Sequence, residues 1–470
     1  MSGAASEFLR KAAIKSADQA HRQIIRHNID QYDASVRRGR SRFENWQAAR
    51  QKSHEIKWEA INHLDRYLLE FEEKVKARGG HIFWAANGEE ARNYIVDLAR
   101  RRQVQTVVKS KSMAAEEIHL APALEEAGLK VYETDLGEFI VQLRNEAPYH
   151  IVTPAMHLTR NEISALFKEK LGGIDSKEPP ELVAAARRWM RKTFFAAEMG
   201  ISGANFLVAD AGMIAITTNE GNADLGTTLP RIHVAIAGIE KIIPRLEDLA
   251  ILWPVLATSG TGQPMTCYNT LIGGPRQSNE PDGPQEFHVV LLDNGRSELL
   301  ADAEQRDVLH CIRCGACLNA CPVFRTVGGH TYGTTYPGPI GSVLTPHLRG
   351  LNEFQHLSYA SSLCGACTEA CPVQIDLHHH LLHNRRNAVN EADRPWTERI
   401  AFKMWRWANS GAGRFAFLGS AGRLALRAAY AIKLENTFFD PLRPWTKERA
   451  APPIPRKSFR AIWRGDLGNN

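Results

Sequence analysis

Residues 311–322 read Cys-Ile-Arg-Cys-Gly-Ala-Cys-Leu-Asn-Ala-Cys-Pro, and residues 361–372 read Ser-Ser-Leu-Cys-Gly-Ala-Cys-Thr-Glu-Ala-Cys-Pro. The first run has the spacing C-x2-C-x2-C-x3-C-P throughout, and the second has serine where the first cysteine would stand. In two-cluster ferredoxins the first three cysteines of such a run hold one iron–sulfur cubane, and the fourth ligates the other cluster. Seven of the eight cysteines lie in these runs, so we predict a protein that carries electrons.

The ligands of the two predicted clusters follow from this exchange of the fourth cysteine. Cluster 1 is expected to be held by Cys311, Cys314, Cys317 and Cys371. Cluster 2 is expected to be held by Cys321, Cys364 and Cys367. Ser361 is the only residue in register for a fourth ligand of cluster 2, and the sequence leaves that ligand unsettled.

Two other uses of clustered cysteines fit the sequence less well. Structural zinc sites usually pair one Cys-x-x-Cys with a distant Cys-x-x-Cys or with histidines, and they do not require two matching ferredoxin runs. Disulfides are disfavoured because the N-terminus lacks the apolar segment of a secretory signal. Cys267 stands apart from both runs and is expected to be a buried apolar thiol.

The composition is that of a soluble globular protein with two or three domains. The chain has 470 residues, of which 44% are hydrophobic and 23% charged, and its net charge of +6 comes largely from arginine-rich ends. These ends lack the interleaved aromatic residues that favour nucleic-acid binding. The apolar stretch 411–432 contains three arginines, so we expect no transmembrane segment, although peripheral membrane contact stays open. We therefore expect a cytoplasmic protein.

Short apolar runs of strand-forming residues alternate with helical patterns in the first two thirds of the chain. The predicted strands are His81–Ala85, Val104–Val108, Leu129–Glu133, Phe206–Ala209, Met213–Thr217, Ile232–Ala237 and His288–Leu292. Apolar residues at helical spacing predict helices at 53–76, 89–101 and 114–127. This alternation indicates an α/β domain with a largely parallel sheet.

Four regions follow from these patterns. They are an N-terminal helical segment (1–59), an α/β domain (60–295), a helical 4Fe-4S ferredoxin-type domain (296–390) and a helical and extended C-terminal segment (391–470). The 42 residues between Cys321 and Cys364 are too many for a compact bacterial ferredoxin. A helical cluster domain is expected for that reason.

Six segments of the α/β domain resemble the lactate-utilisation (LUD) domain. They are Lys109–Ile118, Glu133–Glu138, His150–His157, Ala209–Gly212, Thr218–Asn222 and Gly273–Pro275. The cluster region, including Val327–Gly341, is similar to the same family, in which Ser-Ser-Leu-Cys is also typical at residues 361–364. The resemblance covers nearly the whole chain, and the order of domains is that of the lactate utilisation protein B family.

The resemblance implies a first domain with the fold of ribose-phosphate isomerase and CoA transferases, followed by two 4Fe-4S clusters. It further implies the iron–sulfur subunit of a three-protein system that oxidises L-lactate to pyruvate and so supports growth on lactate. Two co-acting lactate-utilisation subunits would be its partners. The sequence does not identify the electron acceptor.

A few residues of the α/β domain are candidates for binding or catalysis. Glu220 follows a predicted strand, in the kind of loop that holds ligands in open α/β sheets, and it fits either a general base or a cap for backbone N–H groups. Lys109, Ser110 and Lys111 fit an anion site, with Ser112 opening the next helix, or a solvated loop.

The histidines favour structural roles over catalytic ones. His150, His157 and His233 lie in or beside apolar strands and are expected to be core or edge histidines. The run His378–His380, with His383, follows the last cysteine closely, so a solvated helix beside the clusters is favoured over a metal site.

Three functions remain open at this point. The leading interpretation is an electron-transfer subunit of an L-lactate dehydrogenase-type oxidoreductase complex, because the chain shows neither the Gly-x-Gly-x-x-Gly of dinucleotide-binding domains nor a P-loop. The second is that the α/β domain itself binds and oxidises lactate, with Glu220 in its pocket. The third is a redox regulator that uses cluster 2, whose incomplete set of thiolates would make it labile.

Overall fold

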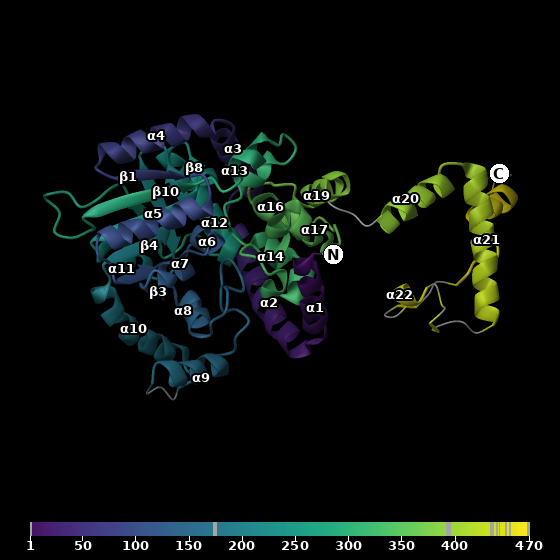
Figure 1. The fold of residues 1–470 in the computed structure, drawn as a ribbon, viewed down its shortest axis with the longest axis horizontal. Helices are drawn as coiled ribbons and strands as arrows, with labels where there is room; N and C mark the ends of the chain where they lie inside the picture. The colour runs from purple at the N-terminus through teal and green to yellow at the C-terminus, as the bar shows by residue number, and fades with distance from the viewer. Residues whose placement is uncertain are drawn as a thin grey trace. The chain divides into compact units, whose positions relative to one another are not determined.

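The computed structural model describes residues 2–172, 176–391, 396–432, 437–438, 440, 442–446, 449–450 and 453–467. The chain divides into two compact units, Met1–Ala392 and Asp393–Asn470. The first unit contains a sheet flanked by helices and, beside the sheet, a group of short helices that carries both cysteine runs (Figure 1).

A parallel six-stranded sheet forms the centre of the first unit. Its strands follow the order β1-β10-β7-β4-β2-β3, and every neighbouring pair is parallel. Their bounds are β1 His81–Ala85, β2 Thr106–Lys109, β3 Lys130–Glu133, β4 Met199–Gly203, β7 Ile232–Gly238 and β10 Glu286–Leu292. Parallel strands need helical crossovers and burial on both faces, which is the architecture that the sequence predicts.

The two faces of this sheet are covered by different layers, because side chains alternate along each strand. On one face Ile232, Val234 and Ile236 of β7 share a core with the helices α5 (Gly88–Arg101), α6 (Met113–Glu117) and α7 (Leu120–Glu126). On the other face Ala235 and Ala237 belong to a second core that runs without interruption into the cluster domain. A third, smaller core lies among α8 (Leu136–Leu143), α9 (Arg160–Lys170) and α10 (Pro179–Ala196).

A second, four-stranded sheet lies next to the first. Its order is β8-β5-β6-β9, with β6 antiparallel to both of its neighbours and β8 parallel to β5. The bounds are β5 Phe206–Val208, β6 Met213–Thr218, β8 Ile242–Ile243 and β9 Tyr268–Ile272. The sequence predicts β5 and β6 but not β8, which has two residues, nor β9, which lacks a buried residue.

The sequence also fails to predict β4, which lies between β7 and β2 in the main sheet. Its sequence, Met-Gly-Ile-Ser-Gly, contains two glycines, and glycine weakens a strand interior. Packing explains Gly200, because a Cβ atom there would lie 1.8 Å from the carbonyl oxygen of Gly226 in α11 (Asn222–Thr228). The close approach of α11 therefore selects a residue that strand propensity disfavours.

Two of the predicted helices are interrupted. The helix predicted at 53–76 is divided into α3 (Trp46–Asn62) and α4 (Leu64–Ala77), because His63 leaves the helical region with φ −129°. The helix predicted at 114–127 breaks at His119, which has φ +50°. The apolar periodicity continues across each break, so the pattern alone does not reveal it.

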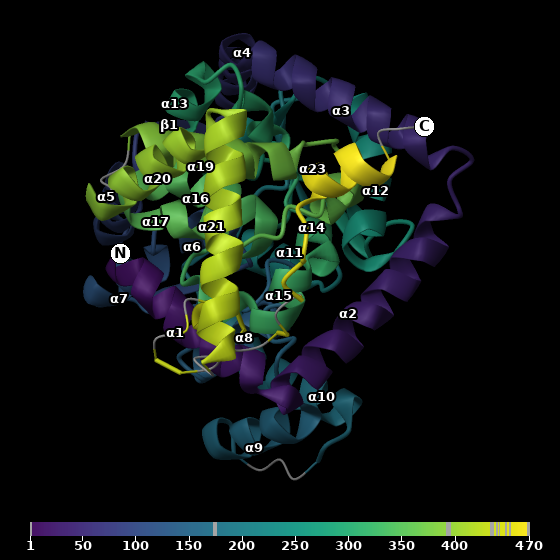
Figure 2. The ribbon, with the colours of Figure 1, turned by 90° about the vertical axis from the view of Figure 1, so that its right-hand side faces the viewer.

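The cluster domain consists of short helices around the two cysteine runs: α13 Arg296–Ala301, α14 Ala316–Ala320, α15 Pro322–Val327, α16 Gly338–Arg349, α17 Leu351–Tyr359, α18 Ala366–Ala370 and α19 Leu377–Glu391. The insertion between the runs forms α15, α16 and α17. The N-terminal helices α1 (Gly3–Ala17) and α2 (Gln19–Arg40) pack on α15, and α2 also packs on α12 (Leu249–Thr261) of the α/β domain (Figure 2).

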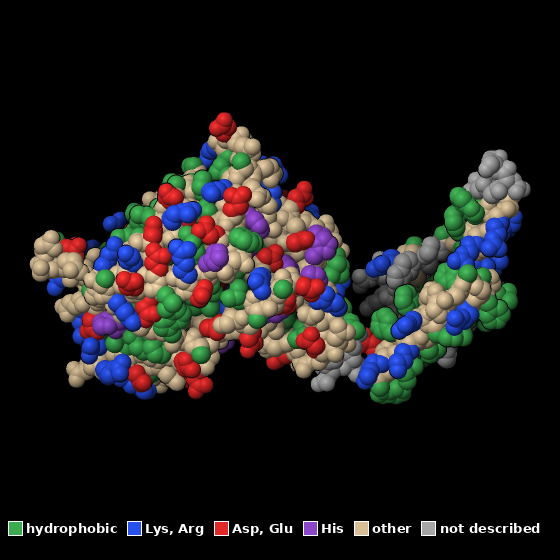
Figure 3. Space-filling view, turned by 90° about the horizontal axis from the view of Figure 1, so that it is seen from above, with side chains coloured by type: hydrophobic (Ala, Val, Ile, Leu, Met, Phe, Trp, Pro, Cys, Tyr) green, Lys and Arg blue, Asp and Glu red, His purple; other side chains and the backbone are tan. Residues whose placement is uncertain are grey.

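The second unit contains α20 (Trp396–Asn409), α21 (Ala412–Ala431), α22 (Arg443–Thr446) and α23 (Phe459–Ile462). Within α20 and α21 no residue is buried, and large apolar side chains such as Trp405 and Phe417 alternate on the surface with arginines (Figure 3). In the part of the chain that the structure describes, no helix is long and apolar enough to span a bilayer.

The contact between β4 and α11 gives a first prediction. Gly200→Ala places a methyl group against the carbonyl oxygen of Gly226 and should lower the free energy of unfolding by about 1–3 kcal/mol, as overpacking does. Gly226→Ala is the matched control, because its Cβ would meet only Val108 Cγ2 at 3.9 Å and alanine favours a helix. Chemical denaturation of both variants checks this, and equal stabilities would contradict it.

Candidate functional site

The two cysteine runs have the same local conformation. Each run places a left-handed residue directly before its Cys-Gly-Ala-Cys segment, Arg313 with φ 62° before Cys314 and Leu363 with φ 57° before Cys364. Each then places a left-handed glycine after that cysteine, Gly315 with φ 78° and Gly365 with φ 79°. The helices that follow, α14 and α18, pack against each other. The sequence repeat is therefore also a repeat in space.

Ser361 holds the same local place in its run as Cys311 holds in the first. The sulfur of Cys311 accepts a hydrogen bond of 3.4 Å from the backbone N–H of Arg313. The hydroxyl oxygen of Ser361 accepts the equivalent bond, of 3.1 Å, from the N–H of Leu363. The Ser361 side chain thus turns into its loop as the cysteine does.

The seven cysteines of the runs form two groups. Burial raises the pKa of Cys317, and further increases come from Cys311, Cys314 and Cys371, which therefore lie near it. These four thiols line one small cavity, here the thiol cavity, whose other lining side chains are apolar except for Arg313.

In the second group, burial raises the pKa of Cys367 to about 11, with smaller increases from Cys321 and Cys364. Cys321 and Cys367 are buried, whereas Cys364 is exposed.

The residues around the thiol cavity fit an iron–sulfur centre. Four thiols face the cavity, and neither a carboxylate nor an imidazole is among its lining residues. The soft sulfur donors suit iron–sulfur chemistry. The N–H group of Ile375 donates to Cys371 Sγ over 3.4 Å, as that of Arg313 does to Cys311, and such bonds tune the potential of a cluster.

A larger cavity, of about 480 Å³, lies where the strands of the main sheet end. Its walls come from the residues after β2, β4, β6 and β7, from α12 and from the first cysteine run; they include Ser110, Lys111, Asp135, Asn205, Glu220, Gly238, Lys241, Gly260, Arg313 and Cys314. We call it the sheet-edge cavity. Ile151, Arg313 and Cys314 line both this cavity and the thiol cavity, so the two cavities adjoin.

Comparison with known proteins identifies the family. A model described as the LUD domain matches residues 68–292, and one described as a 4Fe-4S dicluster domain matches residues 307–375. The proteins named lactate utilization protein B from Bacillus cytotoxicus and Bacillus cereus are each 46% identical over 417 residues, which is 88% of this chain and 88% of theirs. This chain belongs to the lactate utilization protein B family. The homologue from Bacillus anthracis is 45% identical over the same length.

One solved structure, a DUF162 family protein from Deinococcus radiodurans, aligns to 49% of this chain and 98% of its own. Its TM-score is 0.28 and its identity 12%, which is too low to support an argument from structure.

Glu220 lines the sheet-edge cavity, and the structure confirms that it caps backbone N–H groups, whereas its role as a general base stays a prediction. Its carboxylate accepts hydrogen bonds from the N–H of Leu136, at the start of α8, and from Asn222 Nδ2 at 2.6 Å. It therefore caps a helix while lining the cavity. Burial, and then the charge of Asp135, raise the pKa of Glu220 to about 7, which suits a proton acceptor near neutral pH.

The anion site predicted at Lys109, Ser110 and Lys111 is corrected in part. Lys109 is fully buried and bound by Glu133 at 2.7 Å and Glu116 at 3.0 Å, so it is not available to a ligand. Ser110 and Lys111 do line the sheet-edge cavity, and Lys111 Nζ donates to the carbonyl oxygen of Val152 at 2.7 Å. Ser112 caps α6 through Ala115, as the sequence predicts.

Charges deep in the sheet-edge cavity come from residues that the sequence analysis does not single out. Glu240 accepts from Arg296 Nε at 2.6 Å and from Arg313 Nη2 at 3.3 Å. Arg296 is also bound by Glu117 at 2.7 Å. Lys241, in the turn after β7, is half-buried, and burial together with Arg313 lowers its pKa to about 8. No pattern in the sequence distinguishes these residues, because they meet only through the packing of the two domains.

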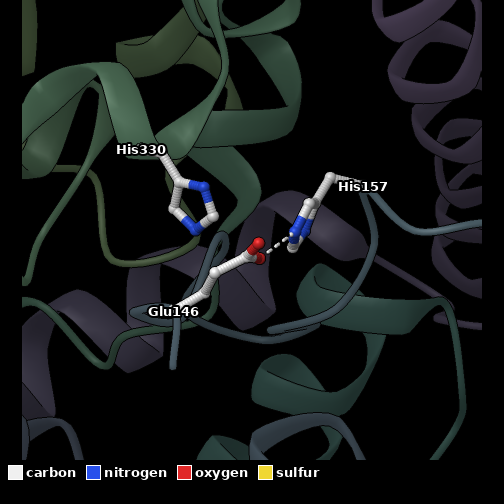
Figure 4. A group of neighbouring side chains, drawn as sticks. All are labelled: Glu146, His157 and His330. Atoms are coloured by element: carbon white, nitrogen blue, oxygen red, sulfur yellow. Dashed lines mark hydrogen bonds and ion pairs between the residues drawn. The ribbon is translucent and has the colours of Figure 1, made fainter. Parts of the chain in front are cut away.

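The predicted structural histidines have partners. His233 Nε2 lies 2.7 Å from Ser202 Oγ, and His150 Nδ1 accepts from the N–H of Val152 at 3.0 Å. His157 Nε2 lies 2.9 Å from Glu146. His330, for which the sequence predicts no role, lies beside Glu146 and His157 (Figure 4).

The Glu146–His157–His330 group joins the two domains. Its potential metal-binding atoms lie within 4.8 Å of one another, and His330 Nε2 also bonds the carbonyl oxygen of Ala147 at 2.7 Å. These contacts tie the loop that precedes α9 to the cluster domain.

Two expectations are wrong in detail. The helix that begins at Leu377 is not solvated at His380, which is buried with its Nε2 2.8 Å from Asp307, because α19 packs on α16 and α17. Cys267 is exposed and not buried, because it lies in the loop before the edge strand β9.

The raised pKa of Glu220 predicts a pH dependence. The folded state binds the Glu220 proton between about pH 4.5 and 7, where the unfolded state has lost it, so stability falls as pH rises through this window. Glu220→Gln removes the effect and should gain about 1 kcal/mol relative to the native chain between pH 5 and 8, after allowance for solvent screening.

Thermal unfolding of both proteins across that range measures the difference. Asp135→Asn should shift the dependence to lower pH, because it removes the neighbouring negative charge. A stability difference that stays constant with pH would show that Glu220 is ionised throughout.

Proposed function

We propose that this chain is the iron–sulfur electron-transfer subunit of a complex that oxidises L-lactate to pyruvate and supports growth on lactate. The proposal is supported by the match to a 4Fe-4S dicluster domain and by relatives named for lactate utilization. The observation that supports it best is that Cys371 lines the thiol cavity together with the first three cysteines of the other run. That arrangement suits the crossed ligation of a two-cluster relay.

In this proposal Cys311, Cys314, Cys317 and Cys371 hold cluster 1. Cys321, Cys364 and Cys367 hold cluster 2, and Ser361 is the candidate for its unassigned fourth ligand. When bound, the clusters supply one-electron transfer. The two groups differ in their surroundings, since Cys314 lines the sheet-edge cavity, whereas Cys364 is exposed. Electrons would enter on the side of the cavity and leave at the surface near Cys364.

The partners belong to the proposal as well. Two co-acting lactate-utilisation subunits and an electron acceptor would complete the system. We place it in the cytoplasm, where unpaired thiols are kept reduced. In a second candidate function, the LUD domain itself binds L-lactate. This function is favoured because Cys314 lines the sheet-edge cavity.

Paired cysteine variants test the ligand assignment. The anaerobically reconstituted protein should bind about eight iron and about eight sulfide ions, as two cubanes require. Cys317→Ala and Cys371→Ala should abolish the same paramagnetic resonance signal of the reduced protein, although 54 positions separate them. Cys321→Ala and Cys364→Ala should abolish the other signal.

The exposed Cys267 provides the control for these variants, and Cys267→Ala should leave the iron content unchanged. Zinc in place of iron would overturn the proposal. Loss of the Cys317 signal in Cys321→Ala, with the Cys364 signal retained, would overturn the ligand assignment.

Ser361→Cys tests the fourth ligand of cluster 2. An alkoxide is a harder and weaker ligand for iron than a thiolate, and it forms only after loss of a proton with a much higher pKa. Cysteine at position 361 should therefore slow the loss of iron from cluster 2 to chelators or oxygen, by about tenfold. Ser420→Cys, at an exposed serine of α21 outside the cluster domain, is the matched control. Equal rates of iron loss in all three proteins would place residue 361 away from the iron.

A further inference from the structure

Two cations of the sheet-edge cavity, Lys241 and Arg313, have donors for which the described residues provide no acceptor. Among the described residues, no hydrogen-bond or ion-pair partner is found for the ammonium group of Lys241. Arg313 uses Nη2 on Glu240, but its Nη1 has no partner although the side chain is only 8% exposed. A buried donor without an acceptor costs about 1–3 kcal/mol, so Arg313 Nη1 favours an acceptor from outside the chain. The half-buried Lys241 lines the same cavity and adds a second positive charge there.

These two cations lie together at the end of the cavity nearest the first cysteine run. Arg313 binds Glu240, the residue that precedes Lys241, at 3.3 Å, and both cations line the cavity with Cys314. Arg313 is further fixed by its guanidinium, which lies 4.4 Å over the ring of Tyr336. A ligand held by this pair would therefore lie against cluster 1.

The other cations of the region are already neutralised or bonded. Arg296 is held between Glu117 and Glu240. Lys57 donates to the carbonyl oxygens of Glu240 and Ile242, at 2.5 Å and 3.1 Å. Lys111, which also lines the cavity, donates to the carbonyl oxygen of Val152 at 2.7 Å and lies 3.9 Å from Glu138. Among the described residues that line the cavity, this leaves Lys241 and one edge of Arg313 open, which matches the two oxygens of a single carboxylate better than the several oxygens of a phosphate ester.

We propose that the sheet-edge cavity binds a small 2-hydroxy or 2-oxo monocarboxylate, with its carboxylate on Lys241 and Arg313. The inference rests on the proposed function, because it takes the thiol cavity to hold cluster 1. The sheet-edge cavity lies beyond the carboxyl ends of the strands, where open α/β sheets usually bind their ligands. The cavity's polar walls, among them Asn205 and Thr218, offer partners for the hydroxyl or keto oxygen.

The simpler reading is that Lys241 and Arg313 only balance the negative charge of the thiolates, since Cys311 interacts with both. Counter-ions of that kind need no ligand. The two readings differ in what an added acid does. If the two cations only balance the thiolates, no acid needs to bind. If they form a ligand site, an added acid should bind, and its affinity should depend on Lys241.

Titration of the full-length, cluster-loaded protein with pyruvate and with L-lactate, followed by calorimetry under anaerobic conditions, tests the proposal. Both acids should bind, and L-lactamide, which has no carboxylate charge, should bind at least tenfold more weakly. Lys241→Met should weaken acid binding by about 10- to 100-fold, the effect of losing one charge-assisted hydrogen bond. Lys130→Met, the same substitution at the exposed amino end of β3, should leave affinity unchanged.

If the acids bind Lys241→Met as tightly as the native protein, or if neither acid binds the native protein, the proposal is wrong. If Lys241→Met fails to assemble cluster 1, the comparison of lactate with lactamide on the native protein decides alone, and equal binding rejects the proposal. Failure of the proposed function can be told apart from failure of the acid-binding proposal, because the purified protein would then lack iron before any acid is added.

Discussion

The buried carboxylate of Glu240 fixes the two halves of the first unit to each other. It accepts from Arg296 at 2.6 Å and from Arg313 at 3.3 Å, and these charges, opposing the effect of burial, hold the pKa of Glu240 at about 2. Arg296 begins α13, whereas Arg313 stands between two cysteines. A buried ionic network contributes more to geometry than to stability, since removing one partner leaves a charge without compensation. The register of the first cysteine run against the sheet depends on this carboxylate.

The network extends the constraint to neighbouring elements. Glu117, at the end of α6, binds Arg296 and accepts from Tyr336 at 2.6 Å in the insertion between the cysteine runs. One continuous apolar core accompanies it from the second sheet into the cluster domain. The LUD domain and the cluster domain consequently behave as one body in their packing. The sheet-edge cavity exists because of this arrangement, with one wall from each domain.

This arrangement gives a physical meaning to the exposure of the cysteines. The cluster 1 thiols lie under the sheet-edge cavity and are mostly buried, which protects a cluster from solvent and lets the local charges set its potential. Cys364 is exposed, so the second group meets the surface. The two groups of cysteines therefore differ in their access to solvent, although they lie in one small domain.

The sequence by itself determined the local features. The cysteine spacing predicted the ligand runs, the alternation of apolar segments predicted the parallel α/β sheet, and the length between Cys321 and Cys364 predicted helices there, because each depends on nearby residues. Only the tertiary structure decided β4, where the carbonyl group of Gly226 requires Gly200, and the meeting of Lys241, Arg313 and Cys314 in one cavity. Those contacts join segments far apart in the chain, and packing, which carries no local pattern, brings them together.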